Sequence, residues 1–196
     1  MARLRTPEQL ARIAGNRLQQ IEDRLGDRNL DERIRFPRGV INTAEFYRKR
    51  YPGLPPTLRT NVAYTMQLQD VLRWLANRFD LGLTAKEMLI KHQIVLLCEV
   101  MEGLAYAAVD ELTSSKSNKR FKKNIDKLCA HQVISESLCR RLHRARELRD
   151  NIHLVRIRRK EYRKYRIRHY NKSLTTLRKL RRAISKKRAP ASRARS

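Results

Sequence analysis

The chain has 196 residues and carries 46 Lys and Arg against 19 Asp and Glu, a formal net charge of +27. This length fits one domain with an appendage, and a hydrophobic fraction of 41% with six Gly and six Pro excludes a low-complexity or fibrous chain. Because such a charge attracts polyanions, we expect nucleic acid as the partner, with an anionic membrane surface as the alternative.

The N-terminal part predicts two helices. Thr6 as N-cap, Pro7 and Gln9 form a capping-box pattern that starts an amphipathic helix ending near Gly26. Thr43 caps a second, short helix that the proline cluster at 52–56 terminates. We therefore predict three regions: an N-terminal helical extension over 1–56, a helical bundle over 57–185 and a disordered basic tail over 186–196.

The middle of the chain predicts the bundle itself. Apolar residues recur at helical spacing over about 57–80, 84–112, 121–130 and 135–152, and a last helix begins at Ser173. Thr84 and Glu87 form a second capping-box pattern. The apolar run 88–109 is interrupted by Lys91, His92, Glu99 and Glu102, which favours a buried core helix over a membrane span. With no strand pattern, the expected fold class is an all-α helical bundle.

The three cysteines, Cys98, Cys129 and Cys139, form no Cys-x-x-Cys pair, so a reducing, cytoplasmic compartment is expected. Cys129, Cys139, His131 and His143 could in principle bind zinc. Their spacing is irregular and no tight knuckle surrounds them, so neither a metal nor a cofactor is predicted.

One stretch, 144–154, gathers arginines, acids and a histidine at the end of an apolar-periodic helix. If Leu148 and Ile152 face the core, Arg149 and His153 share the adjoining flank, together with Arg146 and, further up, Cys139 and His143. A histidine can exchange protons with a ribose hydroxyl, and a guanidinium can stabilise charge on a phosphate. The alternative is that these side chains only hydrogen-bond neighbouring helices.

The sequence Leu-Arg-Asp-Asn-Ile-His-Leu at 148–154, after a long apolar helix with Glu99 and Glu102 and a short helix, resembles the HEPN superfamily over about 84–185. The resemblance implies a bundle of four or five helices and, as in many members, a metal-independent endoribonuclease with a composite site at a homodimer interface. It assigns the catalytic roles to His153, Arg149 and Arg146. Six residues separate Arg146 from His153, and Glu147 follows Arg146. Only three residues separate Arg149 from His153, and Asp150 follows Arg149.

The segment from 155 onward holds eighteen Lys and Arg against one acid, Glu161. Basic residues alternate there with tyrosines, a pattern typical of RNA binding, although the tyrosines could equally pack on the bundle. The candidate nucleic-acid-binding residues are Arg156, Arg158, Arg159, Lys160, Arg163, Lys164, Arg166 and Arg168.

Two functions are therefore expected. The first is a HEPN-like, RNA-directed endoribonuclease of a defence or toxin–antitoxin type, acting as a homodimer and binding a cognate antitoxin or another acidic protein. The second is a non-catalytic, basic helical module that binds nucleic acid. A structural protein with an acidic partner chain is a third possibility.

Overall fold

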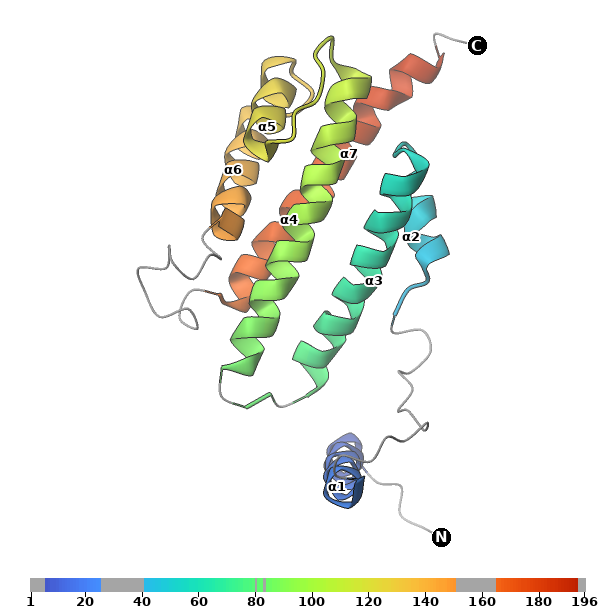
Figure 1. Cartoon of the computed structure of the whole chain (residues 1–196), viewed down its shortest axis with the longest axis vertical. Coiled ribbons are helices and arrows are strands. Elements are labelled where there is room, and N and C mark those ends of the chain that lie inside the picture. Colours follow the sequence, from blue (N-terminus) through green and yellow to red (C-terminus); the bar gives the residue numbers. More distant parts are fainter. Residues whose placement is uncertain (1–5, 26–40, 80, 83, 151–164, 194–196) are drawn as a thin grey trace. The chain divides into compact units, whose positions relative to one another are not determined.

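The computed structural model describes residues 6–25, 41–79, 81–82, 84–150 and 165–193. In these residues the chain forms seven α-helices and no strand, which confirms the predicted all-α helical bundle (Figure 1). The helices are α1 (Pro7–Leu25), α2 (Ala44–Arg50), α3 (Pro56–Arg78), α4 (Ala85–Leu112), α5 (Phe121–Ala130), α6 (Glu136–Asp150) and α7 (Ile167–Arg193).

The chain divides into two compact units, Met1–Pro37 and Arg38–Ser196. In the first unit α1 carries the predicted capping box: the Gln9 amide donates to Thr6 Oγ1 at 3.3 Å, and the Thr6 amide donates to Gln9 Oε1 at 3.0 Å. The second unit begins earlier than the predicted boundary at residue 56. The reason is that α2 packs against α3 and buries Tyr47 and Tyr51 in the common core.

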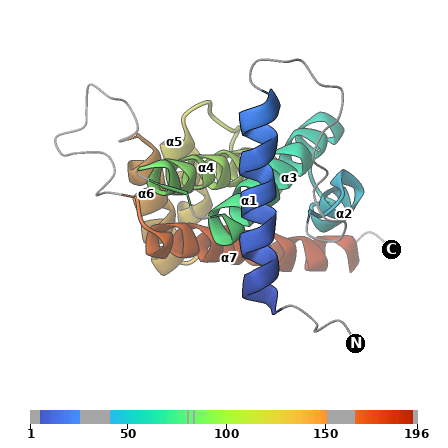
Figure 2. The same cartoon turned by 90° about the horizontal axis from the view of Figure 1, so that it is seen from below.

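Helix α4 is the centre of the second unit and packs against α3, α5, α6 and α7 (Figures 1 and 2). It is long and apolar enough to cross a membrane by length and composition, but 61% of its most apolar window is buried inside the bundle. The expectation of a core helix is thus confirmed. The predicted capping box at its start is wrong, because the Thr84 side chain makes no capping hydrogen bond.

The connection between α5 and α6 is a tight Schellman turn. The Gln132 amide donates to the Cys129 carbonyl and the Val133 amide to the Leu128 carbonyl, both at 2.9 Å. Gln132 takes the left-handed conformation, with φ 53°, that such a turn needs. Val133 and Leu128 are both buried, so the turn brings α6 back along α5 and positions its flank.

Helix α7 differs from the prediction at both ends. It begins at Ile167 and runs to Arg193, so Ser173 is an internal, buried residue and not its cap, and the expected disordered tail over 186–196 is helical as far as Arg193. Tyr165 and Tyr170 are buried in the core and fix the start of the helix. Lys, Arg and Ala favour helix, which explains the continuation past residue 186.

Candidate functional site

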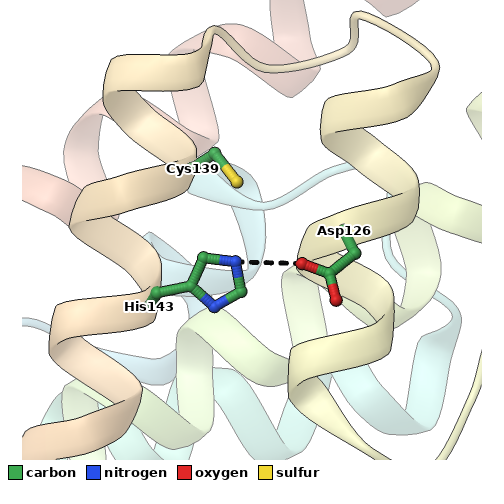
Figure 3. A group of neighbouring side chains, drawn as sticks. All are labelled: Asp126, Cys139 and His143. Atoms are coloured by element: carbon green, nitrogen blue, oxygen red, sulfur yellow. Dashed lines mark ion pairs between the residues drawn. The ribbon is translucent and has the colours of Figure 1, made fainter.

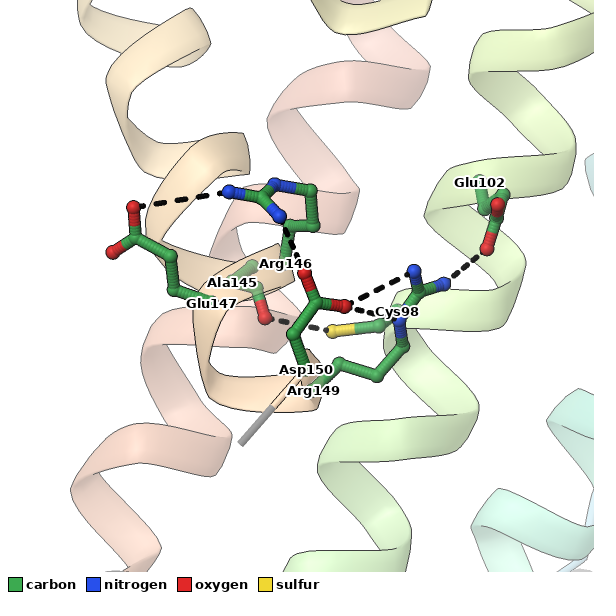
Figure 4. A network of polar contacts seen from close by, with 7 residues as sticks. All are labelled: Cys98, Glu102, Ala145, Arg146, Glu147, Arg149 and Asp150. Carbon is green, nitrogen blue, oxygen red and sulfur yellow. Dashed lines mark hydrogen bonds and ion pairs between the residues drawn. The ribbon is translucent and has the colours of Figure 1, made fainter. Parts of the chain in front are cut away.

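The predicted catalytic arginines both lie on the last turns of α6, on the flank that faces α4 and α5 (Figure 4). His153 lies outside the described residues. The apolar face of α6 points into the core as the sequence predicted, because Leu138, Leu142 and Ala145 are buried.

Arg149 reaches from α6 to α4. Its Nη1 donates to Glu102 Oε2, its Nη2 lies 3.4 Å from Asp150 Oδ1, and its guanidinium carbon lies 5.7 Å from the centre of the Phe121 ring. Partial burial alone would lower the pKa of Arg149, but the charges and hydrogen bonds of Glu102 and Asp150 outweigh it and raise the pKa above its ordinary value. Arg149 is therefore held as a cation between two helices.

Arg146 is compensated in the same way. Its Nη1 donates to Asp150 Oδ2, and its Nη2 lies 4.0 Å from Glu147. Its Nε is buried and has no hydrogen-bond partner in the described structure. Beneath this network the Cys98 thiol donates to the Ala145 carbonyl at 3.3 Å, and burial raises the pKa of the thiol to about 12.

This arginine–carboxylate network (Glu102, Arg146, Glu147, Arg149 and Asp150) has at least one carboxylate for each guanidinium. A phosphate could bind there only by displacing Asp150 or Glu102. As placed, the network joins α6 to α4, which is the alternative that the sequence left open for these residues.

Of the predicted nucleic-acid-binding residues, two lie in the described part of the chain. Arg166 and Arg168 are exposed at the start of α7, where the Arg166 amide donates to His169 Nδ1 at 3.3 Å. The other six, Arg156, Arg158, Arg159, Lys160, Arg163 and Lys164, lie outside the described residues.

A larger cationic surface follows on α7, which carries ten Lys and Arg and no acid. Seven of them are exposed in the described residues. Five of these seven recur every three, four or seven residues, so they share the side of the helix opposite its buried leucines. We call this surface the basic face: Arg168, Lys172, Lys179, Arg182 and Lys186. Arg188 is the cation of α7 that forms an ion pair within the described residues: its Nε lies 2.9 Å from Glu111.

A second cationic feature, the arginine cavity, lies between α2, α3 and α7 and has a volume of about 180 Å³. Its charged lining consists of Arg50, Arg73, Arg178, Arg181 and Asp70. Desolvation, followed by repulsion from Arg50, lowers the pKa of Arg181. Arg181 also lies over the Tyr51 ring at 5.9 Å, and Arg50 over Phe46 at 5.6 Å.

The floor of the arginine cavity is fixed by Asp70, which is 3% exposed. Its Oδ2 accepts the Tyr47 hydroxyl at 2.7 Å and the Asn42 side-chain amide at 2.9 Å, and its Oδ1 accepts Arg73 at 3.0 Å. Desolvation, then the hydrogen bond to Asp70, raises the pKa of Tyr47. Asp70 thereby neutralises Arg73, and Arg50, Arg178 and Arg181 have no ion pair within the described structure.

Between α6 and α7 a groove of about 510 Å³ continues the basic face through Lys172. Arg141 and Arg144 line its α6 side together with Glu147, and His169 and Lys172 line its α7 side. Ser173, with a buried Oγ that has no hydrogen-bond partner in the described structure, lies in the same groove.

Of the four side chains that the sequence offered for zinc, His131 lies apart and contacts Ser115 Oγ at 3.2 Å. Cys139 and His143 lie instead beside Asp126, with the ligand atoms of all three within 4.8 Å of one another (Figure 3).

Comparison with protein-family models, with curated proteins and with solved structures finds no match to this chain.

Proposed function

We propose that this protein binds nucleic acid, with RNA the preferred class. The binding surface consists of the basic face of α7, the arginine cavity and the groove between α6 and α7. The observation that carries the proposal is the absence of carboxylates along α7: ten cations and no acid. Because the cations of the basic face have no ion pair within the described residues, phosphates can bind them without breaking an internal contact. In the arginine–carboxylate network on α6, by contrast, ion pairs would have to break before a phosphate could bind.

The arginine cavity supports RNA over duplex DNA. Its wall combines Phe46, which is 42% exposed, with Arg50 lying over the ring, and unpaired bases stack on such aromatic and guanidinium planes. Arg178 and Arg181 lie in the same cavity and repel each other, so an anion there would relieve a repulsion that the folded protein otherwise retains.

The test compares two variants of equal net charge. Lys179, Arg182 and Lys186 are changed to Gln on the basic face, and Lys119, Lys122 and Lys123, exposed near α5, are changed to Gln as the control. Binding of a labelled single-stranded RNA and of a DNA duplex is measured by fluorescence anisotropy over a salt series. Each phosphate contact to a single strand contributes about −0.7 to the slope of log K against log salt, so losing three reduces its magnitude by about 2.

The basic-face variant should bind RNA more weakly and with that shallower slope, while the control variant keeps the slope of the wild type. Equal losses in both variants would mean that net charge alone drives binding and would refute the assignment to α7. Tighter binding of the duplex than of the single strand would refute the preference for RNA.

A second candidate function is the metal-independent endoribonuclease that the HEPN resemblance implies, with His153, Arg149 and Arg146 as the catalytic residues. The observation in its favour is the position of Arg149, a partly buried guanidinium on the last turn of α6, four positions before His153 in the sequence. The purified protein should then cleave RNA in EDTA and leave cyclic phosphate ends, and His153→Ala should abolish cleavage while His131→Ala does not. If the wild type binds RNA but does not cleave it, the endoribonuclease proposal is refuted and only the nucleic-acid-binding proposal remains.

The same resemblance implies a homodimer, and the cysteine pattern implies a reducing, cytoplasmic compartment; we retain both as part of this second proposal. Light scattering coupled to size-exclusion chromatography measures the mass directly. A monomer that cleaves RNA would contradict the composite site.

A further inference from the structure

Three side chains with metal-binding atoms meet between α5 and α6, on the flank of α6 that also carries Arg146 and Arg149 (Figure 3). His143 Nε2 lies 3.0 Å from Asp126 Oδ1, and the Cys139 thiol completes a set whose ligand atoms lie within 4.8 Å of one another. Asp126 comes from α5, and Cys139 and His143 come from α6.

A fourth side chain borders this set. Cys129 lies on α5 one turn after Asp126. Burial first, and then the neighbouring Cys129 thiol, raise the pKa of the Cys139 thiol, so the two sulfurs lie close enough to interact. Cys129 and Cys139 are both half-buried and both free thiols. With Cys129 beside the three-residue set, two sulfurs, one imidazole nitrogen and one carboxylate oxygen come from the facing sides of α5 and α6.

Local structure explains why these four residues converge. Asp126 and Cys129 are three apart on α5, and Cys139 and His143 are four apart on α6, so each pair lies on one face of its helix. The Schellman turn at Gln132 brings α6 back along α5 and places the two faces opposite each other. His131 is the C-cap of α5 and lies at the turn, where it contacts Ser115.

We propose that Asp126, Cys129, Cys139 and His143 bind a zinc ion that joins α5 to α6. Zinc binds thiolate, imidazole and carboxylate at about 2.0–2.3 Å in a tetrahedron, so its ligand atoms lie about 3.3–3.8 Å apart. The ligand atoms of Asp126, Cys139 and His143 lie from 3.0 Å to at most 4.8 Å apart, which is close to these separations. The mixture of sulfur, nitrogen and oxygen favours zinc over magnesium or calcium, which take oxygen ligands.

This site is independent of the nucleic-acid-binding surface on α7. Its role is structural: four protein ligands fill the coordination shell of the ion, which is the pattern of a structural and not a hydrolytic zinc site. The ion would fix α5 against the α6 flank one turn before Arg146. It would thereby hold the end of α6 in the position that the arginine–carboxylate network uses.

The test uses the full-length chain, reduced and freed of metal by a chelator that is then removed. Co²⁺ is titrated in as a spectroscopic probe, followed by Zn²⁺. We expect one Co²⁺ per chain, with the ligand-field bands of a tetrahedral ion and a thiolate charge-transfer band, and full displacement by Zn²⁺. Zn²⁺ should also raise the Tm of the wild type.

Four variants locate the site. Cys139→Ser and His143→Ala should lose the tetrahedral bands and the Tm increase, and Asp126→Asn should weaken Co²⁺ binding at least tenfold. Cys129→Ser should keep the ligand-field bands but lose about half of the thiolate charge transfer. His131→Ala is the matched control and should bind like the wild type. Circular dichroism of each metal-free variant checks that the helices remain.

Failure of the reduced wild type to bind one ion per chain would overturn the proposal, and so would equal losses in His131→Ala and His143→Ala. A Cys129–Cys139 disulfide that forms in place of metal binding, seen as a mass two hydrogens lower, would also overturn it. Unchanged charge transfer in Cys129→Ser would remove Cys129 from the ligand set. None of these outcomes affects RNA binding by α7, so the two proposals fail separately.

Discussion

The attachment of α2 to α3 rests on one buried carboxylate, and its removal gives a prediction that can be worked out in detail. Asp70 accepts hydrogen bonds from the Tyr47 hydroxyl, from the backbone and side-chain amides of Asn42, and from Arg73. Tyr47→Phe removes one donor and leaves the ring in place. Because the carboxylate keeps its other partners, the loss is that of one hydrogen bond to a charged group, about 1.5–2 kcal/mol.

Asp70→Ala should cost more, because it removes the acceptor shared by these donors. The buried Tyr47 hydroxyl would then lose its acceptor and the half-buried Asn42 backbone amide would be unsatisfied, while the Asn42 side-chain amide would still donate to Tyr47 at 3.3 Å. This predicts a loss of about 3–5 kcal/mol. Arg73, which is 41% exposed, can turn to water and adds little. In the double variant the two losses should not add, because both act on the same bond; we expect a coupling of about 1–2 kcal/mol.

Urea unfolding followed by circular dichroism gives the four free energies of unfolding, and the Tm should fall by about 2–4 °C per kcal/mol for a chain of this length. Tyr64→Phe is the matched control, because Tyr64 lies on α3 and is 56% exposed. It should change the stability by less than about 0.5 kcal/mol. Equal effects of Tyr47→Phe and Tyr64→Phe, or strict additivity in the double variant, would refute the role given to Asp70.

Three further predictions follow from single contacts. Glu102→Gln should cost about 1–2 kcal/mol in urea unfolding, between the values for exposed and buried pairs. It should leave the RNA affinity unchanged, because Asp150 still pairs with Arg149 and the proposed RNA surface lies on α7; tighter RNA binding would show that the α6 flank also binds RNA. Gln132→Gly should raise the free energy of unfolding by about 1 kcal/mol, because Gln132 has a φ of 53°; a loss of stability would contradict the assigned strain. Hydrogen bonds from the Ser117 amide and hydroxyl lower the pKa of Asp110, so this contact stabilises the fold above the ordinary Asp pKa and is lost as pH falls through the lowered value. The protection of the Ser117 amide, measured as its exchange rate relative to the intrinsic rate at each pH, should therefore fall in acid, and Asp110→Asn should remove that pH dependence.

The helices were predictable to within a few residues where local signals decide them. Thr6 with Gln9, and Thr43, start helices as the sequence indicated. Pro56, which was expected only to end the preceding helix, is the first residue of α3. The start of α7 was not predictable in this way. Ser173 looks like an N-cap, but burial of Tyr165 and Tyr170 decides where that helix begins, and burial depends on helices distant in the chain.

The candidate sites, like the helices, were predictable only where local sequence patterns decide the structure. Periodicity predicted that Cys139, His143, Arg146 and Arg149 share one flank of α6, and they do. It could not name their partners, because the register between α6 and its neighbours determines whether Arg149 meets Glu102, 47 positions away. The arginine cavity was missed for the same reason, since its cations come from α2, α3 and α7 and no local pattern connects them.

The distribution of ion-pair partners separates the cations that hold the fold from those without an ion pair in the described structure. Arg146 is paired with Asp150 on its own helix, and Arg149 is paired with Glu102, which joins the end of α6 to α4. The cations of the basic face and Arg181 have no such pairs in the described structure, and their mutual repulsion lowers the stability of the folded chain. A chain retains such a cost where binding an anion offsets it. This contrast, more than the net charge of +27, is why the proposed polyanion surface lies on α7 and not on the arginine-rich end of α6.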